Sequence, residues 1–165
     1  MESPTKLKQI IVHYGVRHQA KKLMEETAEL VEALQDYVDD DSFENLRHIE
    51  EETADCYVLI NQFYLVYTAD SEEEERLIRQ EQETMLHDTK MTYAELLVQA
   101  ACWLIVANAH FNSTGKDIEQ VRKPIRRYLA VLWSLEKKLE LEESRIFSIF
   151  HQKIERQLNR MRNEE

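Results

Sequence analysis

Two short acidic motifs hold the residues of this chain that are best placed to do chemistry. The first is Glu-Thr-Ala-Glu at residues 26–29, and the second is Glu-Thr-Ala-Asp at residues 52–55. Each motif lies in a segment with helical periodicity, where a spacing of three residues places two carboxylates on one face, about one turn apart. Two such helices packed antiparallel would bring together the carboxylates of Glu26, Glu29, Glu52 and Asp55.

A helical wheel separates the carboxylates of the first motif from their acidic neighbour. At about 100° per residue, Glu26 falls inside the apolar stripe of its helix, between Ala33 and Tyr37. Glu29 lies at the edge of that stripe, whereas Glu25 falls clearly outside it. We therefore expect Glu26 to face the core and Glu25 to face water.

The second motif follows the same rule. Glu52 and Asp55 fall on the apolar side of their helix, and Glu50 and Glu51 are predicted to point away from it. A solvated acidic face is the usual interpretation of a helix that is rich in glutamate, and it would leave the positions of Glu52 and Asp55 unexplained. The wheel favours four carboxylates that face the core.

Carboxylates on the core side of a helix must be neutralised, because burying an unpaired charge is costly. Too few basic residues lie on the same stripes to neutralise four of them. A hard divalent cation, Mg²⁺ or in its place Mn²⁺, suits an all-oxygen ligand set. A di-iron centre would need Glu-x-x-His, which does not occur, and zinc would need clustered histidine or cysteine.

Composition and charge indicate the fold class and exclude some classes of function. Hydrophobic residues make up 43% of the 165 residues, which indicates a folded chain, and only 2 glycines and 2 prolines are present, which favours long helices over a sheet with many turns. The formal net charge is −11. A chain that neutralises many nucleic-acid phosphates would need a concentration of lysine and arginine, so bulk nucleic-acid binding is disfavoured.

The cysteines and the apolar segments indicate in which cellular compartment we expect the protein. Cys56 and Cys102 lie in apolar helical stretches without a disulfide pattern, so we expect buried, reduced thiols and a cytoplasmic protein. The first residues do not resemble a signal peptide. The most apolar run, residues 96–107, is shorter than the about 20 residues that cross a bilayer, so no membrane span is predicted.

The periodicity predicts an all-α helical bundle of about six helices. The third and fourth begin with possible capping boxes, at Ser71 with Glu74 and at Thr92 with Glu95, and Ser42 is a plausible N-cap of the second. Pro124 is expected to start or kink the fifth. The predicted helices span residues 16–38, 43–68, 72–88, 93–111, 117–140 and 142–162.

The two halves of the chain look alike in outline, with an offset of about 74 residues between their helical patterns. Residues 1–90 would form one three-helix unit that holds the acidic motifs. Residues 91–165 would form a second, degenerate unit that packs on the first as an internal pseudo-dimer. The alternative is two unrelated three-helix stretches, because amphipathic helices align easily.

The second half contributes no acidic motif, since residues 96–116 contain no Asp or Glu. The apolar run at 96–107 is predicted to be a central buried helix. We expect Trp103, His110 and Phe111 to belong to the core, with a place near a nucleotide base as the alternative. The basic residues between Arg122 and Arg127 are expected on a solvated face, with contact to a triphosphate as the alternative.

The two motifs together resemble a known family. Glu-x-x-Glu, a gap of residues 30–51 and then Glu-x-x-Asp is similar to the signature of the all-α nucleotide pyrophosphohydrolases, which include MazG, dimeric dUTPases, dCTP pyrophosphatases and phosphoribosyl-ATP pyrophosphohydrolase. The segments Lys-Leu-x-Glu-Glu-x-x-Glu-Leu at 22–30 and Glu-Glu-x-Ala-Asp at 51–55 resemble the MazG-like form most. The resemblance covers about residues 12–90.

The resemblance implies a reaction and roles for the residues. A nucleoside triphosphate would be cleaved between its α and β phosphates, with Mg²⁺ held by the four motif carboxylates. Glu25 or Glu29 would act as the general base, and Lys22 would reach a phosphate. The family also implies a homo-oligomer, most simply a dimer. A catalytically weak nucleotide-binding or regulatory protein on the same scaffold is the alternative, as is a purely structural helical protein.

Overall fold

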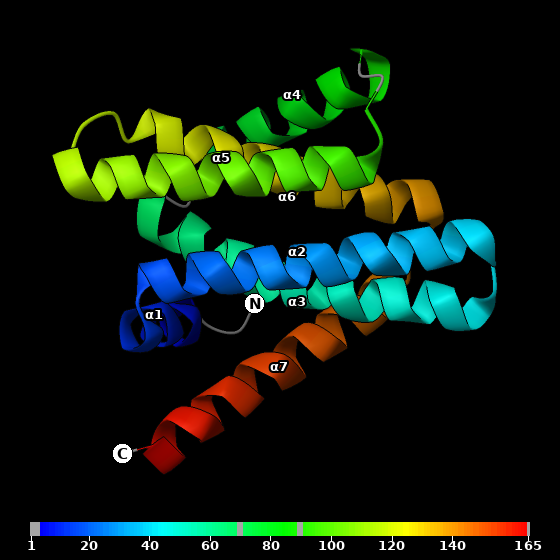
Figure 1. The fold of residues 1–165 in the computed structure, drawn as a ribbon, viewed down its shortest axis with the longest axis horizontal. Coiled ribbons are helices and arrows are strands. Elements are labelled where there is room, and N and C mark those ends of the chain that lie inside the picture. Colours follow the sequence, from blue (N-terminus) through cyan, green and yellow to red (C-terminus); the bar gives the residue numbers. More distant parts are fainter. Residues whose placement is uncertain (1–3, 69–70, 89–90, 165) are drawn as a thin grey trace.

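The chain folds into a bundle of helices that pack side by side (Figure 1). The computed structural model describes residues 4–68, 71–88 and 91–164, and within these residues it contains seven helices and no strand. The predicted all-α class is therefore confirmed. The helices are α1 Pro4–Tyr14, α2 Val16–Asp39, α3 Phe43–Tyr67, α4 Glu72–Asp88, α5 Tyr93–Thr114, α6 Glu119–Leu139 and α7 Glu143–Glu164.

Helix α1 was not predicted. Its buried residues Leu7, Ile10 and Ile11 have the spacing of an amphipathic helix, and they pack on α3 and α7. Glycine at position 15 separates α1 from α2 with a φ of 84°, a backbone conformation that other residues rarely adopt. This short helix closes the end of the bundle at which α2 begins (Figure 1).

Two helical hairpins form the centre of the bundle. Helices α2 and α3 form the first, and α5 and α6 form the second. The hairpins contact each other through α2 against α5 and α3 against α6. Helix α4, which follows the first hairpin, packs on α6, whereas α7, which follows the second hairpin, packs on α3. The third helix of each half therefore packs on the other half, and the halves share one core.

Local sequence signals define several helix ends. The side chain of Ser42 accepts a hydrogen bond from the backbone of Asn45, and Thr92 with Glu95 forms a reciprocal capping box, both as predicted. Gly115 ends α5 in the left-handed conformation that favours glycine at this position. Pro124 lies inside α6, which begins at Glu119, so it does not start the helix.

The core joins the two hairpins through apolar contacts and buried hydrogen bonds. Leu23 and Leu30 of α2 and Leu104 of α5 are fully buried in the same cluster. The hydroxyl groups of Thr27 and Tyr128 lie 2.6 Å apart in this core, which ties α2 to α6. The packing fixes α2 on both sides, because its opposite face contacts α3.

Helix α5 differs from its prediction as a central buried helix. One side packs on α2 and α6, but Val98, Trp103 and Val106 are 41%, 43% and 69% exposed. Cys102 is exposed as well, so the prediction of two buried thiols is wrong for Cys102 and confirmed for Cys56. By length and composition alone, α5 is the one helix among the described residues that could cross a membrane.

The prediction of a solvated basic face at the start of α6 holds for Lys123, which is exposed, and is wrong for Arg126. Arg126 is buried and pairs with Glu74 of α4 at 3.2 Å and with Glu119. Arg122 donates a hydrogen bond to the backbone carbonyl of Tyr67. These side chains hold α4 and the end of α3 onto α6. Because Arg126 is buried and already paired, we do not expect it to contact a phosphate.

We expect Leu104→Ala to lower the free energy of unfolding by about 2–5 kcal/mol, because it leaves a cavity where the two hairpins meet. Urea denaturation measures the loss. Val38→Ala is the matched control, since Val38 is 77% exposed, and it should change the value by less than about 0.5 kcal/mol. Equal effects of the two substitutions would contradict this account of the core.

Candidate metal centre

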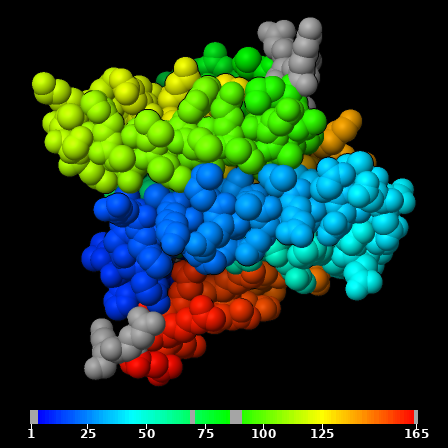
Figure 2. Space-filling view, viewed as in Figure 1, coloured from blue at the N-terminus to red at the C-terminus, as the bar shows by residue number. Residues whose placement is uncertain are grey.

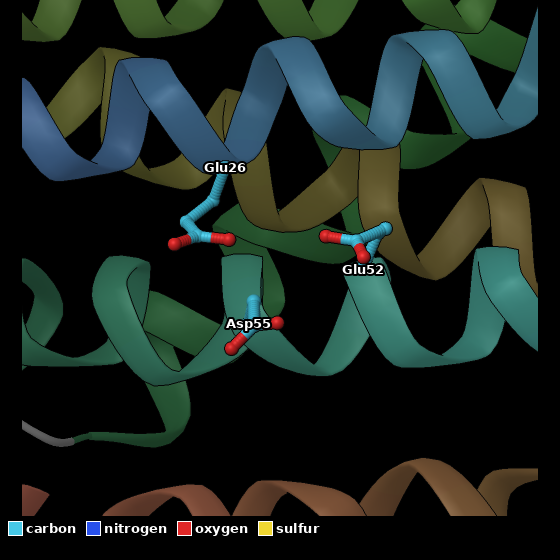
Figure 3. A group of neighbouring side chains, drawn as sticks. All are labelled: Glu26, Glu52 and Asp55. Atoms are coloured by element: carbon cyan, nitrogen blue, oxygen red, sulfur yellow. The ribbon is translucent and has the colours of Figure 1, made fainter.

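Three of the four predicted carboxylates meet between α2 and α3. One oxygen each of Glu26, Glu52 and Asp55 lies within 4.8 Å of the others. Figure 3 shows Glu26 reaching from α2 toward α3, which carries Glu52 and Asp55 one turn apart. The helices are antiparallel neighbours in one hairpin, so the two motifs come together as the spacing predicts.

The side chains of this carboxylate cluster, Glu26, Glu52 and Asp55, are largely shielded from water. Their exposed fractions are 10%, 13% and 20%. Oε2 of Glu52 is buried and has no hydrogen-bond partner among the residues that the structure describes. An unpartnered carboxylate oxygen is costly to bury, and it is the type of atom that a hard cation binds.

Each carboxylate of the cluster has one cationic partner, which corrects the expectation that too few basic residues would be available. Lys22 lies 2.7 Å from Glu26 and His48 lies 3.3 Å from Glu52, each one turn away on the same helix. Lys153 of α7 pairs with Asp55. The charge of His48 depends on its protonation, so the three carboxylates are balanced by two or three positive charges.

The electrostatic surroundings shift the pKa values of several groups. Burial, together with the charge of Glu26, raises the pKa of Glu52 above its ordinary value, although Lys153 opposes this. Burial lowers the pKa of Lys153. The hydrogen bond to Glu26 raises the pKa of Lys22. Burial therefore disfavours the charged forms of both Glu52 and Lys153.

Glu29, the fourth predicted ligand, lies beside the cluster and is exposed. Its pKa is raised by burial of part of the side chain, by a hydrogen bond with Glu26 and by the charge of Glu52. Glu25 is also exposed and contacts Lys22 at 3.3 Å. The pKa of Glu29 thus responds to two carboxylates of the cluster, Glu26 and Glu52.

Glu50 does not point into water, contrary to the prediction. It is 2% exposed and pairs with Arg145 at 3.0 Å and with Arg47 at 3.3 Å. It also accepts a hydrogen bond from the backbone N–H of Glu142. Glu50 thus anchors the start of α7 on α3, and the same helix then carries Lys153 to the cluster.

A groove on the protein lies away from the cluster. It has a volume of about 890 Å³, and it is lined by residues of α1, α3, α4, α6 and α7, among them Tyr57, Asn61 and Trp133. Asn61 donates a hydrogen bond to the carbonyl of Tyr57 in this region. None of the four motif carboxylates lines this groove.

Sequence reasoning missed two of the cations that neutralise the cluster, His48 and Lys153. His48 was visible as a histidine four residues before Glu52, a spacing that brings side chains together on a helix. Lys153 lies on the same packed side of α7 as Ile146 and Phe150. A lysine on an apolar stripe was the one local sign in the sequence that it has a buried partner. Its partner Asp55 is 98 residues away, and no local pattern specifies that contact.

Comparisons with known proteins identify no relative. No family model, no curated protein and no solved structure matches this chain.

We expect Lys153→Met to have opposite effects in the absence and presence of a divalent cation. Without the cation, Asp55 loses its partner and the free energy of unfolding falls by about 1–2 kcal/mol. With Mn²⁺, binding becomes tighter than in the wild type, because no ammonium group competes for Asp55. Calorimetric titration and urea denaturation measure the two effects.

Lys138→Met, which removes an exposed lysine of α6, is the control and should leave Mn²⁺ binding unchanged. A Lys153→Met protein that binds Mn²⁺ no better than the wild type would show that the lysine and the cation do not share a site.

Proposed function

We propose that this protein is a magnesium-dependent nucleoside triphosphate pyrophosphohydrolase that releases a nucleoside monophosphate and pyrophosphate. The observation that carries the proposal is the convergence of Glu26, Glu52 and Asp55 within 4.8 Å of one another on the shielded side of one helical hairpin. The spacing of the two motifs, which resembles that of the all-α nucleotide pyrophosphohydrolases, supplies the reaction class.

The donor atoms fit a small, hard cation. All three are carboxylate oxygens, the ligands that Mg²⁺ and Mn²⁺ prefer. The buried, unpartnered Oε2 of Glu52 offers a lone pair that no described residue uses. When bound, Mg²⁺ would lower the pKa of a water molecule and offset the charge that develops on the leaving pyrophosphate.

The residues around the cluster have complementary roles in this proposal. Glu29 is exposed beside Glu26 and has a raised pKa, so it is suited to accept a proton from the attacking water. Glu25 is less suited, because its contact is with Lys22. Lys22 and Lys153 are held by carboxylates that the cation would engage, and each ammonium group would then be available for a phosphate oxygen.

The ion pairs favour one second candidate. Because Lys22, His48 and Lys153 already offset the charge of the cluster, the fold can tolerate these carboxylates without a metal. The chain would then be a catalytically weak nucleotide-binding protein, or a helical protein in which the network is structural. The orphaned oxygen of Glu52 argues for a bound cation and against a purely structural network, which would leave it unsatisfied.

Pyrophosphate release from a panel of ribo- and deoxynucleoside triphosphates with Mg²⁺ tests the proposal. The wild-type protein should release pyrophosphate and the matching monophosphate from at least one nucleotide. Asp55→Asn should lower kcat/KM at least about 100-fold, because a cation ligand and its charge are lost. Glu44→Gln, which alters an exposed glutamate of the same helix, should retain activity.

Each negative result has a separate meaning. Thermal stabilisation by Mg²⁺ with a nucleotide, but without turnover of any nucleotide in Mg²⁺ or Mn²⁺, would favour the weak nucleotide-binding protein. Neither stabilisation nor turnover would leave a structural ion-pair network. Turnover that Asp55→Asn does not reduce would place the reaction elsewhere on the chain.

A further inference from the structure

The groove lined by α1, α3, α4, α6 and α7 lies away from the carboxylate cluster, and the proposed function does not use it. Its volume of about 890 Å³ falls within the roughly 300–1,000 Å³ of pockets that hold small molecules. Helices α2 and α5, which make up most of the face seen in Figure 2, contribute no residue to this groove. A ligand could therefore occupy the groove independently of a metal between α2 and α3.

Aromatic side chains form much of the wall of the groove. Trp133 of α6 is partly exposed, and Phe147 of α7 is 53% exposed. Aromatic rings that are open to solvent can hold the apolar body of a ligand, and their faces also attract a cation. The guanidinium group of Arg79 already uses one such face, since it lies 5.6 Å from the centre of the Trp133 ring. The other aromatic residues that line the groove are Tyr57, Tyr64 and Phe150.

A carboxylate that no described cation neutralises lies in the same groove. Glu136 of α6 accepts a hydrogen bond from the hydroxyl group of Tyr57. Burial raises the pKa of Glu136, the hydrogen bond from Tyr57 opposes this, and the charge of Glu143 raises the pKa further. No positive charge among the described residues lowers it. A cation placed beside Glu136 would therefore be stabilised by a carboxylate that has only a neutral hydroxyl group as its described partner.

The charges that line the groove also favour a cation. Two positive side chains, Arg79 and Lys137, stand against three negative ones, Glu136, Glu140 and Glu143, which leaves one negative charge in excess. The guanidinium group of Arg79 lies over Trp133, and Lys137 is exposed. The net charge of −11 on the whole chain attracts small cations to its surface as well.

We propose that this groove binds a small organic amine. The ammonium group of the ligand donates hydrogen bonds to the carboxylate of Glu136, and its apolar body lies against the rings of Trp133 and Phe147. An anion in the same position would face the carboxylates of Glu136 and Glu143. A neutral apolar molecule would cover Glu136 without supplying a charge to offset it, which is costly. An amine meets both requirements, because it combines a positive charge with an apolar body.

Binding of 4-phenylbutylamine, followed by tryptophan fluorescence at physiological ionic strength, tests the proposal. The chain has two tryptophans, so Trp103→Phe leaves Trp133 as the reporter in the groove. The amine should change the emission of Trp133 saturably, and calorimetric titration of the unaltered chain should give the same Kd. The alcohol 4-phenyl-1-butanol and the anion 4-phenylbutyrate should bind at least about tenfold more weakly, because neither supplies a positive charge to Glu136.

Three further substitutions in the Trp103→Phe chain locate the site. Glu136→Gln should weaken binding of the amine at least about tenfold and leave binding of the alcohol unchanged, because the amide keeps an acceptor for Tyr57 and loses only the charge. Phe147→Ala should weaken both compounds about threefold to fivefold, since it removes part of the aromatic wall. Glu75→Gln is the control. It removes the same charge from an exposed position of α4 outside the groove, and it should change neither Kd.

Several results would overturn the proposal. Binding of the amine that survives Glu136→Gln, or that the alcohol equals in the parent chain, would show that the groove selects apolar surface alone. Tighter binding of 4-phenylbutyrate than of the amine would show that Arg79 and Lys137 determine its preference. No saturable change with any of the three compounds would also contradict an amine site. None of these results depends on pyrophosphate release, so the proposed function is tested separately.

Discussion

The close approach of three carboxylates on the shielded side of one hairpin is the constraint on which the account of this site depends. Glu26, Glu52 and Asp55 lie within 4.8 Å of one another in surroundings that raise the pKa of Glu52. Like charges at such distances repel each other strongly outside bulk water. The cluster persists only because cations oppose it, and in this structure two of them are lysines from different ends of the chain.

The rest of the fold supplies those cations and holds the hairpin closed. Helix α2 is fixed between α3 and the second hairpin, with the Thr27–Tyr128 contact in the core, so Glu26 is held facing α3. The buried ion pairs of Glu50 with Arg145 and Arg47 anchor α7, and α7 then places Lys153 against Asp55. Lys153 would have to leave Asp55 when a divalent cation binds there. The packing of α7 on α3 therefore also determines how easily this ion pair breaks.

The sequence was sufficient for the local features and insufficient for the contacts between distant helices. Periodicity predicted α2 to within a residue, and it placed Glu26 on the core side because Glu26 falls between Ala33 and Tyr37 on the helical wheel. It failed for Glu50, whose burial depends on Arg145 of another helix. It also failed for the outer face of α5, because an apolar stretch does not reveal which of its sides the rest of the chain covers.

The central claim is that Glu26, Glu52 and Asp55 bind a divalent cation. Crystals soaked in MnCl₂ would test it most directly, through an anomalous difference map. We predict one Mn²⁺ peak within coordination distance of oxygens from all three carboxylates, with the Lys153 ammonium group moved away from Asp55. A map without a peak at this position, with Lys153 still paired to Asp55 at saturating Mn²⁺, would contradict the account.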